Sequence, residues 1–441
     1  MRCLPFIREG CRKGKNMSQL RFGFADTIIT PELNGTFMDG YGFRISPATG
    51  IRAPLHAKVM AVCDEKDAFL LFNIDLIGLN ERLYRLVSRQ ISAFTHVPVE
   101  NIALNFIHTH AAPAAGILDE LPINYDYFGY VGDRCAEAAN LAVSRAVPCT
   151  VCSEILPEQM IHALNRRGRG VIDRSIRSSA FRDTEGNLRG VICSASCHAV
   201  INTSMEISPD WLASLNEQSS DACPWLFFQG RCADINPYQD EGLDMDGFLA
   251  AVGRDLSEPV ERFIQRAKTG ESLSGSLECA YEWVTLPMKD QNRDTLEAEI
   301  DALRKEYAGT TGVEKHVRFR EIRWREHMIE MIDKKEPFDI TVPLQCMKLG
   351  NALLFCMVPF ELLTLLGNKI EHLAVQAGWP PEKVYVCGYS NALYSYLPSE
   401  EEFEFGGYEV SGATHWYNLP ECTPETSKKM LFWFEKHIFR F

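Results

Sequence analysis

Short apolar runs alternate with longer amphipathic stretches along most of the chain. The apolar runs are rich in β-branched and aromatic residues, which is typical of buried strands. They lie at residues 57–63, 68–76, 102–107, 190–194, 225–229, 353–358 and 384–386. In the amphipathic stretches apolar residues recur every three or four positions, which predicts helices at 80–94, 126–146, 246–268, 295–307, 315–334 and 362–377. This alternation predicts an α/β fold with mixed β-sheets flanked by helices.

Residues 288–337 differ from the rest of the chain in their density of charge. Acidic and basic side chains crowd residues 297–306 and 318–323, while Leu296 and Ile300 lie on one apolar stripe. Such a pattern is typical of paired amphipathic helices with a solvated face. We therefore expect a charged helical insert, an arm or cap packed on the main body.

Domain organisation is predicted to be simple. No internal repeat, low-complexity tract or Gly/Ser-rich linker divides the sequence, which favours a single domain over residues 17–441. Residues 1–16 precede the first patterned segment and are expected to be a disordered tail or the product of an upstream start codon.

Composition excludes several functions. A formal charge of −14 argues against a nucleic-acid partner, because such binding draws on clustered Lys and Arg. No stretch approaches the roughly 20 apolar residues of a membrane span, and no glycine-rich phosphate loop follows a strand. The 15 cysteines lack the regular spacing of a secreted disulfide framework, which is typical of the reduced thiols of a cytoplasmic protein.

The strongest candidate chemistry follows the apolar run at 102–107. His108 and His110 come directly after it, and because side chains alternate along a strand, both imidazoles are expected on one face. Small residues at 111–115 leave room for an ion and a substrate. Neutral imidazole is a preferred zinc ligand, so the pair predicts a metal site. A lone histidine, by contrast, is more often a hydrogen-bonded core or surface residue.

Later segments offer the further ligands that a catalytic zinc needs. His198 ends another apolar run, Glu361 follows the run at 353–358, and the loop at 388–409 is rich in tyrosine and glycine. Other roles are open for two of these features. Glu361 could be a carboxylate favoured at a helix N-terminus, and the loop tyrosines could be packing residues. Asp210 is a candidate acceptor for a ligand imidazole or, equally, a turn residue.

Several short segments, taken in order, carry a family resemblance. They are Met38-Asp39-Gly40-Tyr41, Ile107 to Pro113, Asn165-Arg166-Arg167, the segment around His198, Val358-Pro359-Phe360-Glu361, and Asn391 to Pro398 followed by Tyr408-Glu409. In this order they resemble the catalytic domain of the neutral/alkaline non-lysosomal ceramidases, zinc enzymes that hydrolyse the amide of N-acylsphingosine. The similarity runs from about Phe22 to about Tyr417.

The resemblance implies a complete site. It implies one zinc ion per chain, with ligands His108, His198, Glu361 and Tyr396. It also implies that His110 and Arg166 line the pocket and hold the substrate carbonyl or oxyanion, and that Tyr408 donates a hydrogen bond. Zinc lowers the pKa of a bound water to about 7, so such a site would attack an amide or ester carbonyl with zinc-bound water.

The chain also departs from the ceramidases. The family's Gly-Asp-Val-Ser-Pro-Asn is matched by Ala233 to Tyr238, in which Asn236 replaces the serine often proposed as nucleophile. Because Asn cannot form an acyl-enzyme in the usual way, attack by zinc-bound water is favoured, with Asn236 as a hydrogen-bond donor. The sequence has neither the family's C-terminal immunoglobulin-like domain nor its secretion signal. We therefore expect a cytoplasmic bacterial-type homologue that hydrolyses a small soluble amide, lactam or ester.

Other functions stay open at this point. They are a true ceramidase-like lipid amidase, a catalytically silent zinc- or ligand-binding homologue, and an isomerase or lyase that uses zinc as a Lewis acid. An amidohydrolase barrel would place His-x-His on its first strand and add a late Asp, which does not fit the order of segments here. The expected partner is a small-molecule or acyl-amide substrate, and assembly into a homo-oligomer is left open.

Overall fold

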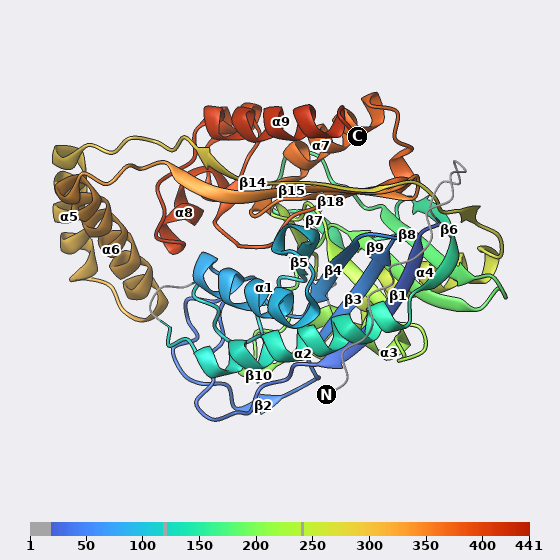
Figure 1. Ribbon diagram of the computed structural model, residues 1–441. Helices are drawn as coiled ribbons and strands as arrows, with labels where there is room; N and C mark the ends of the chain where they lie inside the picture. Colours follow the sequence, from blue (N-terminus) through green and yellow to red (C-terminus); the bar gives the residue numbers. More distant parts are fainter. Residues whose placement is uncertain (1–18, 118–120, 240–241) are drawn as a thin grey trace.

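Two β-sheets packed face to face, with helices on both outer sides, form the body of the molecule (Figure 1). The computed structural model describes residues 19–117, 121–239 and 242–441, so the predicted tail at 1–16 lies outside the described residues. The layers follow one another as helix, sheet, sheet and helix. The α/β class with mixed sheets that the sequence predicts is therefore confirmed.

The larger sheet runs in the order β11-β9-β8-β6-β1-β3-β4-β5, with β13 beside β6. Its strands are β1 (Arg21–Ile28), β3 (His56–Cys63), β4 (Ala68–Ile74), β5 (Ile102–Phe106), β6 (Val147–Leu156), β8 (Ile176–Asp183), β9 (Leu188–Ala195), β11 (Trp225–Gln229) and β13 (Glu271–Ser272). The pairs β4/β5 and β9/β11 are parallel and the other pairs antiparallel.

The smaller sheet runs in the order β14-β15-β16-β18. Its strands are β14 (Leu277–Leu286), β15 (Ile340–Leu349), β16 (Leu353–Met357) and β18 (Val384–Cys387), and only β16/β18 is parallel among these pairs. Helices α7 (Thr364–Gln376) and α9 (Pro424–Ile438) cover its outer face.

Four helices cover the outer face of the larger sheet. They are α1 (Glu81–Thr95), α2 (Tyr125–Ser144), α3 (Ala213–Gln218) and α4 (Met245–Arg266). Side-chain alternation then divides the apolar residues between two cores. On β4, Phe69 and Leu71 belong to the cluster between the sheets, together with Phe355 of β16, whereas Leu70 and Phe72 belong to the cluster beneath the helices.

Short elements complete the fold at the ends of the sheets. The paired short strands are β2 (Gly50–Ile51) with β10 (Glu206–Ile207), β7 (Ala163–Asn165) with β12 (Ile235–Pro237), and β17 (Glu361–Leu362) with β19 (Tyr396–Leu397). The short helical turns are η1 (Val99–Asn101), η2 (Asp210–Leu212), η3 (Pro381–Lys383), η4 (Glu400–Phe405) and η5 (Tyr408–Gly412).

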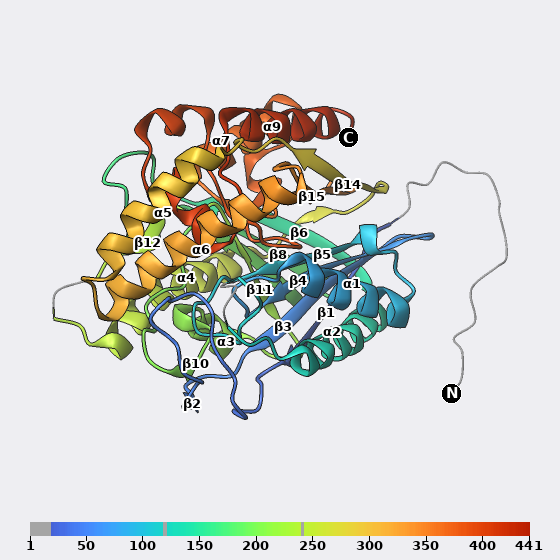
Figure 2. The same ribbon diagram turned by 90° about the vertical axis from the view of Figure 1, so that its left-hand side faces the viewer.

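The charged helical insert is present as an arm of two packed helices, α5 (Arg293–Tyr307) and α6 (Gly312–Lys334). The arm stands to one side of the sheets in Figure 1 and faces the viewer in Figure 2. Leu296 of α5 packs with Trp324 and Met328 of α6, while the outer faces carry the predicted charges. The short helix α8 (Ala413–Trp416) packs against α6.

Each predicted strand and helix has a counterpart within a few residues of its expected bounds. The apolar runs in the sequence did not predict β1, β6, β8, β14 and β15, because charged residues interrupt the apolar pattern of these strands. On β8, for example, Arg177 is buried because Glu371 of α7 pairs with it. Within the described residues, no helix combines the length and apolar character of a membrane span.

Candidate metal centre

The candidate ligands come from the carboxyl ends of strands in both sheets. β5 leads to His108, β9 leads to His198, and β16 leads to Glu361. All three side chains are almost fully buried. The centre therefore lies where the two sheets meet, although its members are separated by up to 253 positions along the chain.

His108 is fixed by its backbone and by one ring nitrogen. Its φ of 61° lies in the left-handed region, which a non-glycine residue adopts only at an energetic cost. The Nδ1 atom lies 2.7 Å from the carbonyl oxygen of Ile77. Because a carbonyl only accepts, Nδ1 carries the proton and donates it there, which leaves Nε2 for the centre.

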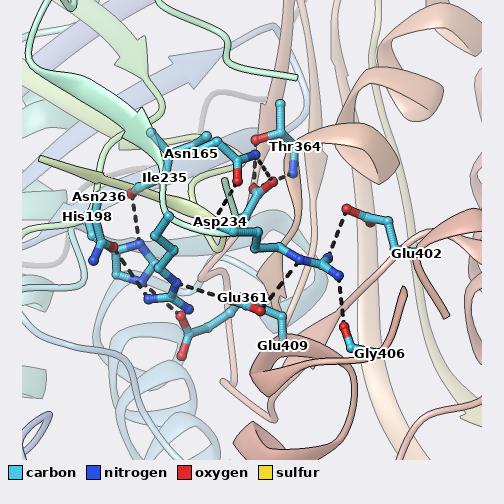
Figure 3. A network of polar contacts seen from close by, with 12 residues as sticks. Asn165, His198, Asp234, Ile235, Asn236, Glu361, Thr364, Glu402, Gly406 and Glu409 are labelled. Atoms are coloured by element: carbon cyan, nitrogen blue, oxygen red, sulfur yellow. Dashed lines mark hydrogen bonds and ion pairs between the residues drawn. The ribbon is translucent and has the colours of Figure 1, made fainter. Parts of the chain in front are cut away.

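His198 is held in the same way. Its Nδ1 donates to the carbonyl oxygen of Ile235 at 3.1 Å, and its Nε2 lies 3.1 Å from Oε2 of Glu361 (Figure 3). Burial lowers the pKa of His198 below its ordinary value, against the opposing effect of Glu361. The imidazole is therefore neutral at pH 7, with its Nε2 lone pair facing the carboxylate.

Glu361 and Tyr396 are direct partners in the parallel pair β17/β19. Oε2 of Glu361 also lies 3.4 Å from Nε2 of His108 and accepts from the Tyr389 hydroxyl at 3.4 Å, while Oε1 accepts from the Tyr417 hydroxyl. Burial favours a neutral carboxyl, but His108 and His198 outweigh it and hold the pKa of Glu361 well below its usual range. The carboxyl group is therefore ionised.

This donor set fits a cation. The Nε2 atoms of His108 and His198 both face Oε2 of Glu361, at 3.4 and 3.1 Å, while both Nδ1 protons point away to carbonyl groups. Two imidazole nitrogens and one carboxylate oxygen therefore converge on one buried point. Lone pairs that converge in this way match a metal site, where a ligating histidine donates its other N–H to a carbonyl or carboxylate.

His110 lies beside these ligands rather than apart from them. Its Nε2 is 3.2 Å from Nε2 of His108, and the three imidazoles of residues 108, 110 and 198 offer nitrogens that all lie within 4.8 Å of one another. Burial and the two neighbouring imidazoles hold the pKa of His110 well below its ordinary value. Gly40, with φ of 102°, packs so closely that an added Cβ would lie 2.4 Å from the His110 ring.

Arg166 lies among the site residues that the resemblance assigns to substrate binding rather than to the metal. Its Nε donates to Glu409 at 2.8 Å and its Nη1 to Oδ1 of Asn236 at 3.4 Å. Its Nη2 is buried without a hydrogen-bond partner in the described part of the chain. The guanidinium also lies over the rings of Tyr396 and Tyr408, with its carbon 5.4 and 5.6 Å from their centroids. The structure thus brings Arg166, Asn236 and both tyrosines together.

A cavity of about 230 Å³ opens onto the candidate ligands, and neither Arg166 nor Asn236 is among its lining residues. Its lining includes His108, His110, Glu361, Tyr396 and Tyr408, and is completed by Gly40, Tyr41, Gly42, Ile77, Ile117, Trp416 and Tyr417. Tyr408 is 46% exposed, so it stands at the cavity mouth. Tyr394, the neighbouring alternative to Tyr396, instead donates toward Glu81 and the carbonyl of Thr341.

Sequence reasoning missed Gln229, the buried last residue of β11. Its side-chain Nε2 donates to the carbonyls of Ile107, at 2.9 Å, and Cys197, at 3.1 Å. These are the residues that precede His108 and His198. Its backbone N–H donates to Asn105 of β5 at 2.8 Å. The sequence did hold one indication of this role, namely a polar glutamine at the end of the apolar run Trp-Leu-Phe-Phe-Gln.

Asp234 is a second buried residue that positions the site and that the sequence did not reveal. Its carboxylate accepts from the side chain of Asn165 at 2.8 Å and from the backbone N–H of Thr364 at 2.9 Å (Figure 3). Its carbonyl accepts from the backbone N–H of Arg166 at 2.9 Å. It therefore ties the Arg166 segment to the start of α7, three residues beyond Glu361.

Asp210 takes the turn role, and the suggestion that it accepts from a ligand imidazole is wrong. Its carboxylate accepts from the backbone N–H groups of Asn202, at 2.6 Å, and Trp211, at 2.8 Å. The acceptors for the two imidazoles are main-chain carbonyls instead. Burial raises the pKa of Asp210 to about 6.

Two solved structures share this fold. The neutral ceramidase from Pseudomonas aeruginosa superposes with a TM-score of 0.74 at 18% sequence identity, over 96% of this chain and 74% of that chain. A ceramidase complexed with C2 gives a TM-score of 0.73 at 17% identity, over 96% and 75%. No protein-family model and no curated protein matched the sequence. The resemblance predicted from short segments is thus confirmed at the level of the fold.

Proposed function

We propose that this chain, which has the fold of the neutral ceramidases, is a zinc-dependent hydrolase that cleaves an amide, lactam or ester bond in a small soluble substrate. One zinc ion per chain would be held by His108, His198, Glu361 and Tyr396. When bound, zinc supplies Lewis-acid polarisation of a carbonyl and acidifies a water molecule.

The observation that carries this proposal is the convergence of two imidazole nitrogens and one carboxylate oxygen on one buried point. Two buried imidazoles whose Nδ1 protons are committed to carbonyls face an ionised carboxylate. Imidazole nitrogens and a carboxylate oxygen at this spacing form a donor set of the kind that binds zinc. Tyr396 lies beside Glu361 in register and lines the same cavity as His108, whereas the Tyr394 hydroxyl is directed to Glu81.

The remaining site residues would act on the substrate. Arg166 has one buried Nη2 still available to donate to a carbonyl oxygen as negative charge develops there. His110 is neutral and lines the cavity next to His108, so it can exchange a hydrogen bond with substrate. Tyr408 offers a hydroxyl at the mouth.

Asn236 distinguishes this site from one with a serine nucleophile. Its Oδ1 accepts from Arg166, which leaves the amide N–H groups to donate toward a substrate carbonyl. An amide nitrogen is not a nucleophile, so acyl transfer to the protein at this position is not part of the proposal.

Cavity size supports a compact substrate. Ligand pockets commonly measure about 300–1,000 Å³, and the cavity here holds about 230 Å³. A cytoplasmic setting is part of the same proposal, and it is supported by the 13 cysteines of the described residues, all of which are free. The single catalytic unit over 17–441 and any homo-oligomer stay predictions.

The test combines metal analysis with a substrate panel. We expect the purified protein to hold one zinc ion per chain and to hydrolyse short N-acyl amines, lactams or esters. Its hydrolytic activity should be lost when a chelator removes the metal and should return when zinc is added. Ready hydrolysis of N-acylsphingosine alone would instead establish the lipid amidase. Bound zinc without hydrolysis of any acyl compound would favour the binding or isomerase alternatives.

A further inference from the structure

Helix α6 of the arm holds the segment that follows η5. Arg320 donates through Nη2 to the carbonyl of Trp416 at 2.8 Å, and Trp324 donates through Nε1 to the carbonyl of Leu419 at 2.8 Å. His415 stacks on Trp324 with ring centroids 3.8 Å apart and contacts Glu321 through Nδ1 at 2.8 Å. The arm therefore contacts this segment at three successive points.

The same segment reaches the metal centre. Tyr417 donates its hydroxyl to Oε1 of Glu361, and Trp416 lines the catalytic cavity next to it. The Trp416 indole also presses on the loop that carries Tyr41, since a Cβ added at Gly42 would lie 2.9 Å from two indole carbons. A chain of contacts thus runs from α6 through Trp416 to the cavity wall.

Trp416 separates two hollows. The catalytic cavity of about 230 Å³ and an outer cavity of about 370 Å³ share Tyr41, Gly42 and Trp416 in their linings. The lining of the outer cavity includes His316 and Arg320 of α6, whereas His108, His110 and Glu361 line only the inner one. The indole and the Tyr41 loop form the partition between them.

We propose that the arm sets the substrate length limit, with Trp416 as the specificity-determining residue. Held by α6, the indole closes the catalytic cavity on the side where a longer acyl chain would pass, so the site selects compact acyl groups. This inference rests on the proposed metal hydrolase, because it concerns what fits beside that centre. Removal of the indole would join the cavities and let methylene groups enter the outer one, where their burial is favourable.

A series of alkyl hydroxamates tests this without a known substrate, because hydroxamates bind zinc directly. Binding of acetohydroxamate, octanohydroxamate and palmitohydroxamate to zinc-loaded protein is measured by calorimetry. We expect wild type to bind the two-carbon probe at least about tenfold more tightly than the eight-carbon probe. Trp416→Ala should remove or reverse that preference, while Trp416→Phe should keep it. Trp283→Ala is the matched control, since Trp283 is also partly buried but packs on Arg85 away from both cavities.

Equal affinity of wild type for short and long probes, or an unchanged preference in Trp416→Ala, would overturn the inference. Failure of acetohydroxamate to bind zinc-loaded wild type would overturn it as well, since the inner cavity would then be closed to ligands. Failure of the proposed function has a different signature, namely normal hydroxamate selectivity with no hydrolysis of any amide or ester.

Discussion

The metal centre and the helical arm are held by different forces, although Trp416 and Tyr417 connect them. Around the centre, buried side chains donate to main-chain carbonyls, as His108 does to Ile77 and His198 to Ile235. Along the arm, most polar contacts are exposed ion pairs. Buried hydrogen bonds are costly to leave unmade, whereas exposed ion pairs contribute little. Substitutions should therefore have large effects at the centre and small ones along most of the arm.

The largest effect is expected for Glu361→Gln. This substitution keeps the size of the side chain but removes the charge that faces two imidazole nitrogens. Since a catalytic metal contributes several kcal/mol, loss of its carboxylate ligand should lower kcat/KM by about 10³-fold. The measurement is hydrolysis by zinc-supplemented protein. Glu402→Gln serves as control, because that buried carboxyl contacts Arg167 and Ser399 instead; a similar loss there would contradict a special role for Glu361.

Gln229→Leu should come next. It leaves the carbonyls of Ile107 and Cys197 unsatisfied and frees the two histidine segments to move. We expect a destabilisation of about 2–4 kcal/mol and a loss of zinc affinity of about 10–100-fold. Denaturant unfolding and metal titration measure the two effects.

Gln345→Leu is the matched control for that prediction. Gln345 is equally buried and also donates to two carbonyls, those of Glu100 and Ile102, which lie at the start of β5 rather than beyond its end. It should destabilise the fold to a similar extent but leave zinc affinity close to that of wild type. Equal losses of zinc affinity in both variants would show that Gln229 acts only through general stability.

His415 offers a smaller, pH-dependent effect at the inner end of the arm. Burial and the nearby Arg325 both disfavour a positive charge on the imidazole. The hydrogen bonds to Glu321 and Glu421 have the larger effect, so the pKa of His415 is raised. Because the pKa of His415 is higher in the folded than in the unfolded protein, its charged contacts stabilise the fold fully below the unfolded pKa of about 6.5. This stabilisation is lost as pH rises through the pKa in the folded protein. His415→Gln should therefore weaken the docking of α6 by about 1.5 kcal/mol at pH 6 and by less at pH 9.

Hydrogen exchange of the α6 amides at the two pH values measures this. The contacting acids stay ionised throughout, since Glu421 has its pKa lowered to about 2 and Glu321 also has a lowered pKa. An identical effect of the substitution at pH 6 and pH 9 would mean that the charge on His415 does not contribute.

The smallest effect is expected on the outer face of the arm. Arg304 pairs with Glu326 at 3.0 Å, but its side chain is 59% exposed. Arg304→Ala should change the free energy of unfolding by less than about 0.5 kcal/mol. A loss as large as that predicted for His415→Gln would show that the outer ion pairs, rather than the inner contacts, hold the arm in place.

The same contrast explains what sequence could predict. Apolar periodicity located the strands that end at His108, His198 and Glu361, because alternation and burial are local properties. It did not locate Gln229 or Asp234, whose roles depend on carbonyl and amide groups brought close only by the packing of distant strands. Arm helices were predicted from their charge, yet the contact of α6 with Trp416 depends on tertiary packing that no periodicity encodes.

The most direct test of the central claim compares the zinc content of His108→Ala and His110→Ala. The account predicts that His108→Ala loses the metal, whereas His110→Ala keeps one zinc per chain and loses activity. Full zinc content in His108→Ala would contradict the proposed centre. Loss of zinc in both variants would contradict the division of roles and make the three imidazoles at 108, 110 and 198 the ligand set instead.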